Sequence, residues 1–368
     1  MTETTTGAQT GTLDFTYQAL PMRVKFAPGS LAMLPAELDA LGLRKVLVLC
    51  SPEQEATGQM VAEVLGERSA GILPNAVMHV PIEVADRASA HAAEVGADGC
   101  VTVGGGSAIG LGKAIALKHG LPIVAIPTTY AGSEMTPVWG LTAEGRKQTG
   151  RDARVLPSSV IYDPELTASL PVGMSVTSAI NAIAHAVEAL YAPDATPIIS
   201  LMAEEGVRAL TGALPGIVAD PQDVAARSQA LYGSWLCGAT LGATTMSLHH
   251  KLCHALGGTL NLPHAQTHTV VLPYALAYNQ PAAPQAKAAL SRALGGAQNP
   301  ALALWERAGQ LGAPRTLAEL GMTAQDVDRI AEEVTGYSYG NPRPISLEAV
   351  KGLLRDALEG NTPREDPA

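Results

Sequence analysis

The alternation of short apolar runs with helix-like segments constrains the fold of this 368-residue chain more than any other feature. The alternation continues to about residue 165 and is typical of a parallel sheet covered by helices. Helices are predicted at 53–67 and 85–97. Strands are predicted at 20–31, 45–51, 76–81, 99–105 and 122–129, followed by a hairpin and one more strand within 139–164.

The pattern changes at Leu166, where long Ala- and Leu-rich stretches with helical spacing begin. Few β-branched clusters occur beyond this point. We therefore predict an α/β nucleotide-binding domain at 12–165 and an all-helical domain at 166–360. Polar flexible tails are expected at 1–11 and 361–368.

Composition and charge exclude several classes of protein. The net charge is −10 and no basic stripe appears, which argues against nucleic acid as a partner. No apolar run approaches the roughly 18 residues of a membrane span, and the polar N-terminus lacks the apolar core of a secretory signal. We expect a cytoplasmic globular protein. Its four cysteines show no CxxC spacing, so free buried thiols are predicted.

A glycine cluster lies between a predicted strand and a helix in "GCVTVGGGSAIGLGKAIAL". Glycine lets the backbone approach a pyrophosphate closely, and the start of the helix offers unpaired N–H groups. The pattern is neither GxGxxG nor a Walker A loop, and a tight turn also requires glycine. The segment therefore predicts a dinucleotide or phosphate site, with a purely structural turn as the alternative. Its candidate residues are Gly104, Gly105, Gly106 and Ser107.

A second polar turn, "IPTTYAGSE", follows the next predicted strand. Open α/β sheets bind ligands at the carboxyl ends of their strands, where this turn is expected. The alternative is a Thr/Ser turn that satisfies its own backbone. Nucleotide contacts are expected from Thr128, Thr129 and Ser133.

Two pairs of polar residues recur at helical spacing. Asn181 and His185 lie four apart in "SAINAIAHAVEALYA", and His250 and His254 do so in "SLHHKLCHALGGTLNLPHAQTH". Residues at this spacing share one helical face, so two helices could present four polar side chains to one cavity. Asn supplies only a neutral oxygen, so the pairs alone leave open whether a metal binds.

These motifs, in this order, resemble the iron-containing alcohol dehydrogenase superfamily over nearly the whole chain. The segments "IPTTYAGSEMTPVWGLT" and "GRKQTGRDARVLPSSVIYDPELT" are similar, more narrowly, to the maleylacetate reductases. The resemblance implies a dehydroquinate synthase-like architecture, an α/β dinucleotide-binding domain followed by an all-α domain. It also implies NADH or NADPH as cofactor and a homodimer.

The resemblance also assigns roles within the histidine motifs. Metal-dependent relatives bind Fe²⁺ or Zn²⁺ through an Asp and three His, and those positions correspond here to Asn181, His185, His250 and His264. His254 matches a histidine beside the nicotinamide and the substrate. Without the Asp, the charge of a cation is uncompensated, so we expect a vestigial site that works without metal.

The reaction implied is reduction of the C=C bond of maleylacetate to 3-oxoadipate in the degradation of aromatic compounds. Hydride adds to the carbon β to the ketone, and pocket histidines stabilise the enolate. The substrate is a dicarboxylate, so Lys251 and Arg343 are expected to bind it, together with Tyr130. Lys147, Arg151 and Arg154 are weaker candidates.

Ser51 follows the strand whose end carries an Asp in NAD-preferring relatives, so nothing there is expected to repel NADPH and both cofactors should serve. Three alternatives stay open. The chain could be a metal-dependent alcohol dehydrogenase that reduces a carbonyl, a sugar-phosphate cyclase similar to dehydroquinate synthase, or a non-catalytic binding protein.

Overall fold

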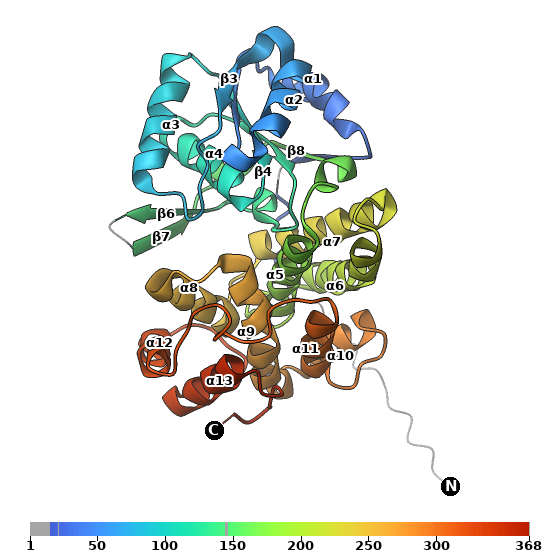
Figure 1. Ribbon diagram of the computed structural model, residues 1–368, viewed down its shortest axis with the longest axis vertical. Helices are drawn as coiled ribbons and strands as arrows, with labels where there is room; N and C mark the ends of the chain where they lie inside the picture. Colours follow the sequence, from blue (N-terminus) through green and yellow to red (C-terminus); the bar gives the residue numbers. More distant parts are fainter. Residues whose placement is uncertain (1–14, 21, 144–145, 368) are drawn as a thin grey trace.

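The computed structural model describes residues 15–20, 22–143 and 146–367. An α/β part lies above a helical part in the view of Figure 1. The α/β part contains a six-stranded sheet in the order β1-β8-β5-β4-β2-β3, and every neighbouring pair is parallel. Its strands are β1 (Arg23–Phe26), β2 (Val46–Leu49), β3 (Ser69–Leu73), β4 (Gly99–Gly104), β5 (Ile123–Pro127) and β8 (Ser159–Tyr162).

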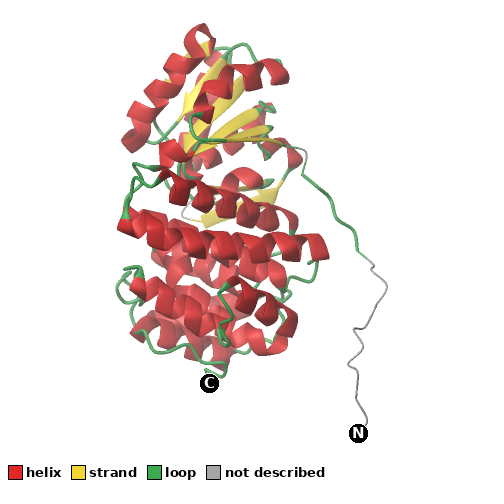
Figure 2. Cartoon of the chain, turned by 90° about the vertical axis from the view of Figure 1, so that its right-hand side faces the viewer, coloured by secondary structure: helices red, strands yellow, loops and turns green. Residues whose placement is uncertain are grey.

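Helices cover both faces of this sheet, which explains why its central strands are continuous apolar runs. Leucines of α1 (Leu34–Leu41) and α2 (Glu55–Leu65) pack on one face. Alanines and leucines of α3 (Ile82–Glu94) and α4 (Gly106–His119) pack on the other. The predicted α/β fold of this part is confirmed, and Figure 2 shows helices on either side of the strands.

One predicted strand was wrong. Residues 76–81 form a turn in which His79 and Val80 have φ values of 66° and 44°, and strands do not adopt positive φ. The third strand is instead β3, from the weakly apolar "SAGIL". The turn that follows β3 reaches the carboxyl edge of the sheet, where Ala76 donates its N–H to the carbonyl of Cys50.

The antiparallel hairpin of β6 (Val138–Ala143) and β7 (Arg146–Arg151) was predicted and is present. It lies between the parallel sheet and α8 (Leu248–Leu260) in Figure 1. The hairpin therefore covers the boundary between the two parts of the molecule.

The second part contains helices and loops but no strand among its described residues, as predicted. The sheet ends with β8 at Tyr162 and the first long helix, α5, starts at Val172, so the change from sheet to helices lies near residue 165. In addition to α8, its helices are α5 (Val172–Leu190), α6 (Pro197–Ala219), α7 (Val224–Ala243), α9 (His264–Asn279), α10 (Pro284–Ala293), α11 (Pro300–Gln310), α12 (Asp326–Thr335) and α13 (Leu347–Glu359).

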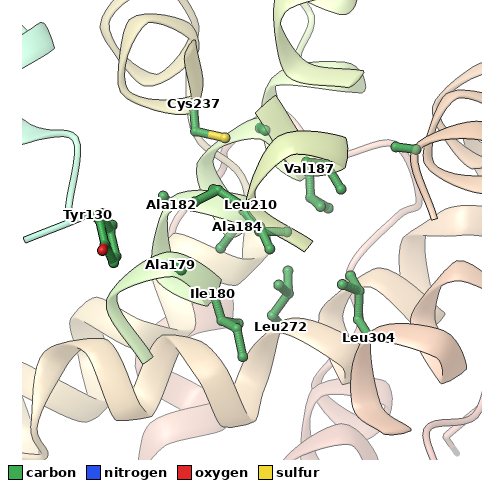
Figure 3. Close-up of a cluster of buried hydrophobic side chains, with 14 of the residues drawn as sticks. Tyr130, Ala179, Ile180, Ala182, Ala184, Val187, Leu210, Cys237, Leu272 and Leu304 are labelled. Atoms are coloured by element: carbon green, nitrogen blue, oxygen red, sulfur yellow. The ribbon is translucent and has the colours of Figure 1, made fainter. Parts of the chain in front are cut away.

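Helix α5 forms the centre of this part. Its small residues Ala179, Ala182 and Ala184 are completely buried and allow close approach of neighbouring helices. Figure 3 shows them against Leu210 of α6 and Leu272 of α9. Because α5 is fixed on several sides, the polar side chains that it carries are held rigidly.

The two predicted tails differ in what the structure describes. The tail at 1–11 lies outside the described residues. Residues 361–367, expected to be flexible, contact the helical part, where Arg364 pairs with the nearly buried Asp356 at 2.8 Å. No helix among the described residues is long and apolar enough to cross a membrane. All four cysteines are buried and free, as predicted.

Candidate active site

The glycine turn joins β4 to α4. Gly104 has φ 143°, and a Cβ there would lie 2.5 Å from Oε1 of Gln54, so only glycine fits. A Cβ on Gly105 would lie 2.9 Å from the Thr129 methyl group. Gly106 differs, because a Cβ on it would meet nothing within 4 Å. The first residue of α4 therefore faces open space.

Three cavities meet at Gly106 and form a continuous path along the boundary of the two parts. The outer cavity, of about 770 Å³, is bordered by both polar turns. The middle cavity, of about 460 Å³, shares Ser107 and Thr129 with the outer cavity. The inner cavity, of about 490 Å³, shares Asn181 and His264 with the middle one.

The predicted cofactor residues divide among these cavities. Gly104 lines none of them and instead packs against Gln54, whose amide donates to Thr128 Oγ1 at 2.6 Å. Ser133 borders the inner cavity and neither of the other two, and its carbonyl oxygen accepts a hydrogen bond from Lys113 at 2.7 Å. The outer cavity is bordered by Ser51, Gly105, Gly106, Ser107, Thr128 and Thr129.

The inner cavity collects the polar pairs that the spacing predicted. Asn181 and His185 come from α5, and His250 and His254 come from α8. His264, the first residue of α9, completes the group. Two helices therefore do present four polar side chains to one cavity.

A chain of hydrogen bonds connects these histidines to a buried carboxylate. Glu188 Oε2 lies 2.7 Å from His250 Nδ1, and His250 Nε2 lies 2.8 Å from His185 Nδ1. His185 Nε2 lies 3.2 Å from the carbonyl oxygen of Ala131. Three such contacts require three protons, whereas two neutral imidazoles carry two. The group formed by Glu188, His250 and His185 therefore has a place for one further proton beside the cavity.

Glu188 is the functional candidate that the sequence interpretation missed. It is completely buried and also accepts the N–H groups of Ser247 and His249, both at 2.8 Å, at the start of α8. This carboxylate fixes the helix that carries His250. The signal was present, because Asn181, His185 and Glu188 follow the i, i+4, i+7 spacing of one helical face.

Burial lowers the pKa of three histidines in and behind the cavity, His185, His249 and His268. The pKa of His185 is well below its usual value because the ring is desolvated and because His250 and His264 lie nearby. His249 and His268 form a second buried pair, 2.9 Å apart, and burial also lowers the pKa of each.

The second histidine pair lies near a cysteine. Ligand atoms of His249, His268 and Cys253 lie within 4.8 Å of one another. Burial raises the pKa of the Cys253 thiol well above its usual value. Its Sγ lies 3.7 Å from His249 Nε2, the same nitrogen that faces His268.

Two cations border the inner cavity, Arg151 at the end of β7 and Lys251 on α8. Arg151 donates to the carbonyl of Gly242, and Lys251 Nζ lies 5.7 Å from the centre of the Tyr339 ring. None of the described residues that line this cavity is Asp or Glu. The cavity is therefore locally positive within an acidic protein.

Two predicted substrate-binding residues lie elsewhere. Arg343 stacks on Tyr278, with its guanidinium 4.4 Å from the ring centre, and pairs with Asp366 at 3.1 Å. Tyr130 is completely buried, and its hydroxyl accepts a hydrogen bond from Arg227 at 3.1 Å. Arg343 is therefore bound by the acidic C-terminal segment, and Tyr130 belongs to the core. Neither borders the three cavities.

Comparison with known proteins identifies the family of this chain. Residues 21–164 match the iron-containing alcohol dehydrogenase family, and residues 175–358 match the C-terminal part of the Fe-containing alcohol dehydrogenase family. The chain belongs to the iron-containing alcohol dehydrogenase family. The predicted resemblance and architecture are thereby confirmed.

The narrower resemblance is confirmed as well. Maleylacetate reductase of Burkholderia cepacia is 55% identical over 349 residues, which cover 95% of this chain and 99% of that protein. The crystal structure of maleylacetate reductase from Agrobacterium tumefaciens matches with a TM-score of 0.92 at 50% identity, covering 96% of this chain and all of that one. An iron-containing alcohol dehydrogenase from Corynebacterium glutamicum matches with a TM-score of 0.91 at 45% identity, covering 97% and 99%.

Proposed function

We propose that this chain reduces the C=C bond of maleylacetate to give 3-oxoadipate, with NADH or NADPH as the hydride donor. One observation carries the proposal: a cavity with histidines and two cations, and no acidic side chain among its described lining residues, adjoins the glycine turn. Such a cavity suits a dianionic substrate that develops an enolate. The chain is 48–55% identical to maleylacetate reductases, which favours reduction of the C=C bond and not reduction of a carbonyl group.

The path of cavities fits a nicotinamide nucleotide. The glycine turn at the start of α4 offers backbone N–H groups to a pyrophosphate, and Gly106 leaves the space that a side chain would fill. The outer cavity would then hold the adenosine, and the middle cavity leads to Asn181. When bound, the reduced nucleotide supplies the hydride.

The residues of the inner cavity account for the remaining steps. Arg151 and Lys251 bind the two carboxylates of the substrate. Hydride addition at the carbon β to the ketone moves charge onto the ketone oxygen, and imidazole N–H groups stabilise that charge. The Glu188–His250–His185 group then provides a proton to the neighbouring carbon.

We also propose that the reaction needs no metal ion, because the residues at the vestigial site do not fit one. Three imidazoles and the amide of Asn181 bring no negative charge to a divalent cation. The buried acid Glu188 is turned toward His250 and two backbone N–H groups. The facing nitrogens of His185 and His250 point at each other, at 2.8 Å. No step is therefore assigned to a metal.

Changing Gly106 to Val is expected to raise the Kd of NADH by about 10- to 100-fold, because steric overlap of this kind costs about 1–3 kcal/mol. Its Cβ meets no protein atom, so the melting temperature should change little.

Gly173→Val is the matched control for Gly106→Val. Gly173 also lies in the first turn of a helix with open space around it, but it lines none of the three cavities. Fluorescence titration gives the Kd of NADH for each protein, and thermal denaturation gives the melting temperature. If the wild type, Gly106→Val and Gly173→Val bind NADH with equal affinity, Gly106 does not belong to the nucleotide site. Gly105→Val is less informative, because it would strain Thr129.

Replacing Arg151 by Gln, or Lys251 by Met, is expected to raise the KM for maleylacetate about 10- to 100-fold, since a charge-assisted hydrogen bond contributes about 1.5–3 kcal/mol. The Kd of NADH should not change. Arg154→Gln is the control, because Arg154 lies three residues further on and pairs with Asp152 at 2.7 Å, outside the cavity. A KM as high in the control as in the cavity variants would refute the assignment.

Product analysis tests the proposed function. Purified protein with NADH and freshly generated maleylacetate should form one 3-oxoadipate per NADH oxidised. A hydroxy acid that retains the C=C bond would show carbonyl reduction instead, and an NADH level that stays constant would point to a cyclase or a binding protein.

The homodimer and the cytoplasmic location remain predictions. A mass by light scattering close to that of one 37.9 kDa chain at micromolar concentration would rule out the dimer.

A further inference from the structure

We propose that Glu53 makes this chain select NADH over NADPH, by placing a negative charge in the outer cavity where the adenosine ribose would lie. The inference rests on the proposed use of a nicotinamide nucleotide. It adds a specificity-determining residue that the sequence motifs did not single out.

The described lining of the outer cavity carries one negative charge and no positive charge. Glu53 is the only charged side chain among the described residues that line it, and no Lys, Arg or His accompanies it. A 2′-phosphate would therefore meet a carboxylate without a compensating cation. In dinucleotide-binding sheets an acidic residue binds the ribose hydroxyls, whereas an Arg accommodates the 2′-phosphate.

The local structure keeps Glu53 at this place. Strand β2 ends at Leu49 at the carboxyl edge of the sheet, and a short 3-10 turn, Pro52–Gln54, follows directly after Ser51. Proline at the start of the turn fixes its backbone. The pKa of Glu53 is lowered by hydrogen bonds from its own backbone N–H and from the Ser51 hydroxyl. The carboxylate is thus ionised at neutral pH and held beside Ser51.

This arrangement changes the expectation drawn from Ser51 alone. The Asp of NAD-preferring relatives is absent at that position, but a carboxylate two residues later borders the same cavity. Ser51 then acts as the donor that orients Glu53. Both nucleotides would enter the cavity, with NADPH at a disadvantage of about tenfold, as expected for like charges at a solvated site.

Fluorescence titration of the nicotinamide without substrate tests the proposal. The wild type is expected to bind NADH about tenfold more tightly than NADPH. Glu53→Gln should bring the two Kd values within about threefold of each other, and Glu53→Lys should reverse the preference. Glu55→Gln is the control, because Glu55 is a neighbouring exposed acid that does not line the cavity, and it should keep the wild-type ratio.

The outcomes separate this inference from the proposed function. Equal Kd values in the wild type, or an unchanged ratio in Glu53→Gln, would overturn the role of Glu53 and leave the reduction intact. Binding of neither nucleotide to the wild type would overturn the proposed function and this inference together.

Discussion

Replacing Asn181 by Asp is expected to create a site that binds Zn²⁺ or Fe²⁺ and to slow the metal-free reduction by about 100-fold. Oδ1 of Asn181 is buried at the junction of the middle and inner cavities and has no hydrogen-bond partner among the described residues. A carboxylate there would supply the missing negative charge to a cation. The same charge would oppose a dianionic substrate and a developing enolate, where loss of one donor costs about two orders of magnitude.

The control for this change is Asn181→Ala, which removes the amide and adds no charge. Isothermal titration with Zn²⁺ and steady-state rates in chelator should be measured for both variants. Only the Asp variant should gain metal affinity, and it should be the slower of the two. If Asn181→Asp binds no more metal than the wild type, the absence of the acid is not what keeps the site free of metal.

Replacing Glu188 by Gln is expected to destabilise the protein by about 3 kcal/mol and to lower kcat at least tenfold. Glu188 is completely buried and accepts three hydrogen bonds, so a neutral amide would place its own N–H groups against other donors. His250 would lose the carboxylate that fixes its ring, and the group would lose the place that it offers to a further proton. The pH profile of kcat should change shape as well.

Glu205→Gln is the control for Glu188→Gln, because it makes the same change from acid to amide at the surface and not in the core. Glu205 pairs with Arg208 on α6 at the surface, so its loss should change stability by less than about 1 kcal/mol and leave kcat unchanged. Urea denaturation and steady-state kinetics measure both quantities. A Glu188→Gln enzyme with lower stability, but with wild-type kcat and pH profile, would reduce Glu188 to a structural residue.

Local patterns predicted most elements of this fold and the two pairs of polar residues that line its inner cavity. Helical spacing predicted that Asn181 and His185 share one helical face, as do His250 and His254, and the packing of the helices brings both pairs to one cavity. The strand at 69–73 was missed because "SAGIL" is short and partly polar, whereas the apolar run at 76–81 looked more like a strand.

The cations were predicted with mixed success, because their positions depend on contacts far apart in sequence. Lys251 borders the inner cavity, whereas Arg343 does not. Arg343 turns to a carboxylate 23 residues away, whereas Arg151 reaches the cavity because residues of both hairpin strands line it. Spacing carries no information about either arrangement. Glu188 was missed for a different reason: its position on the face was evident, but its partner on α8 was not.

Turnover by metal-free protein is the most direct test of the central claim that the histidine cavity reduces maleylacetate without an ion. Protein purified in the presence of chelator should be assayed for bound metal by elemental analysis and then for NADH oxidation with maleylacetate. We predict full activity at far less than one ion per chain, with no change on addition of Fe²⁺ or Zn²⁺. A stoichiometric ion bound by His185, His250 and His264, with activity lost in chelator and restored by the metal, would contradict this account.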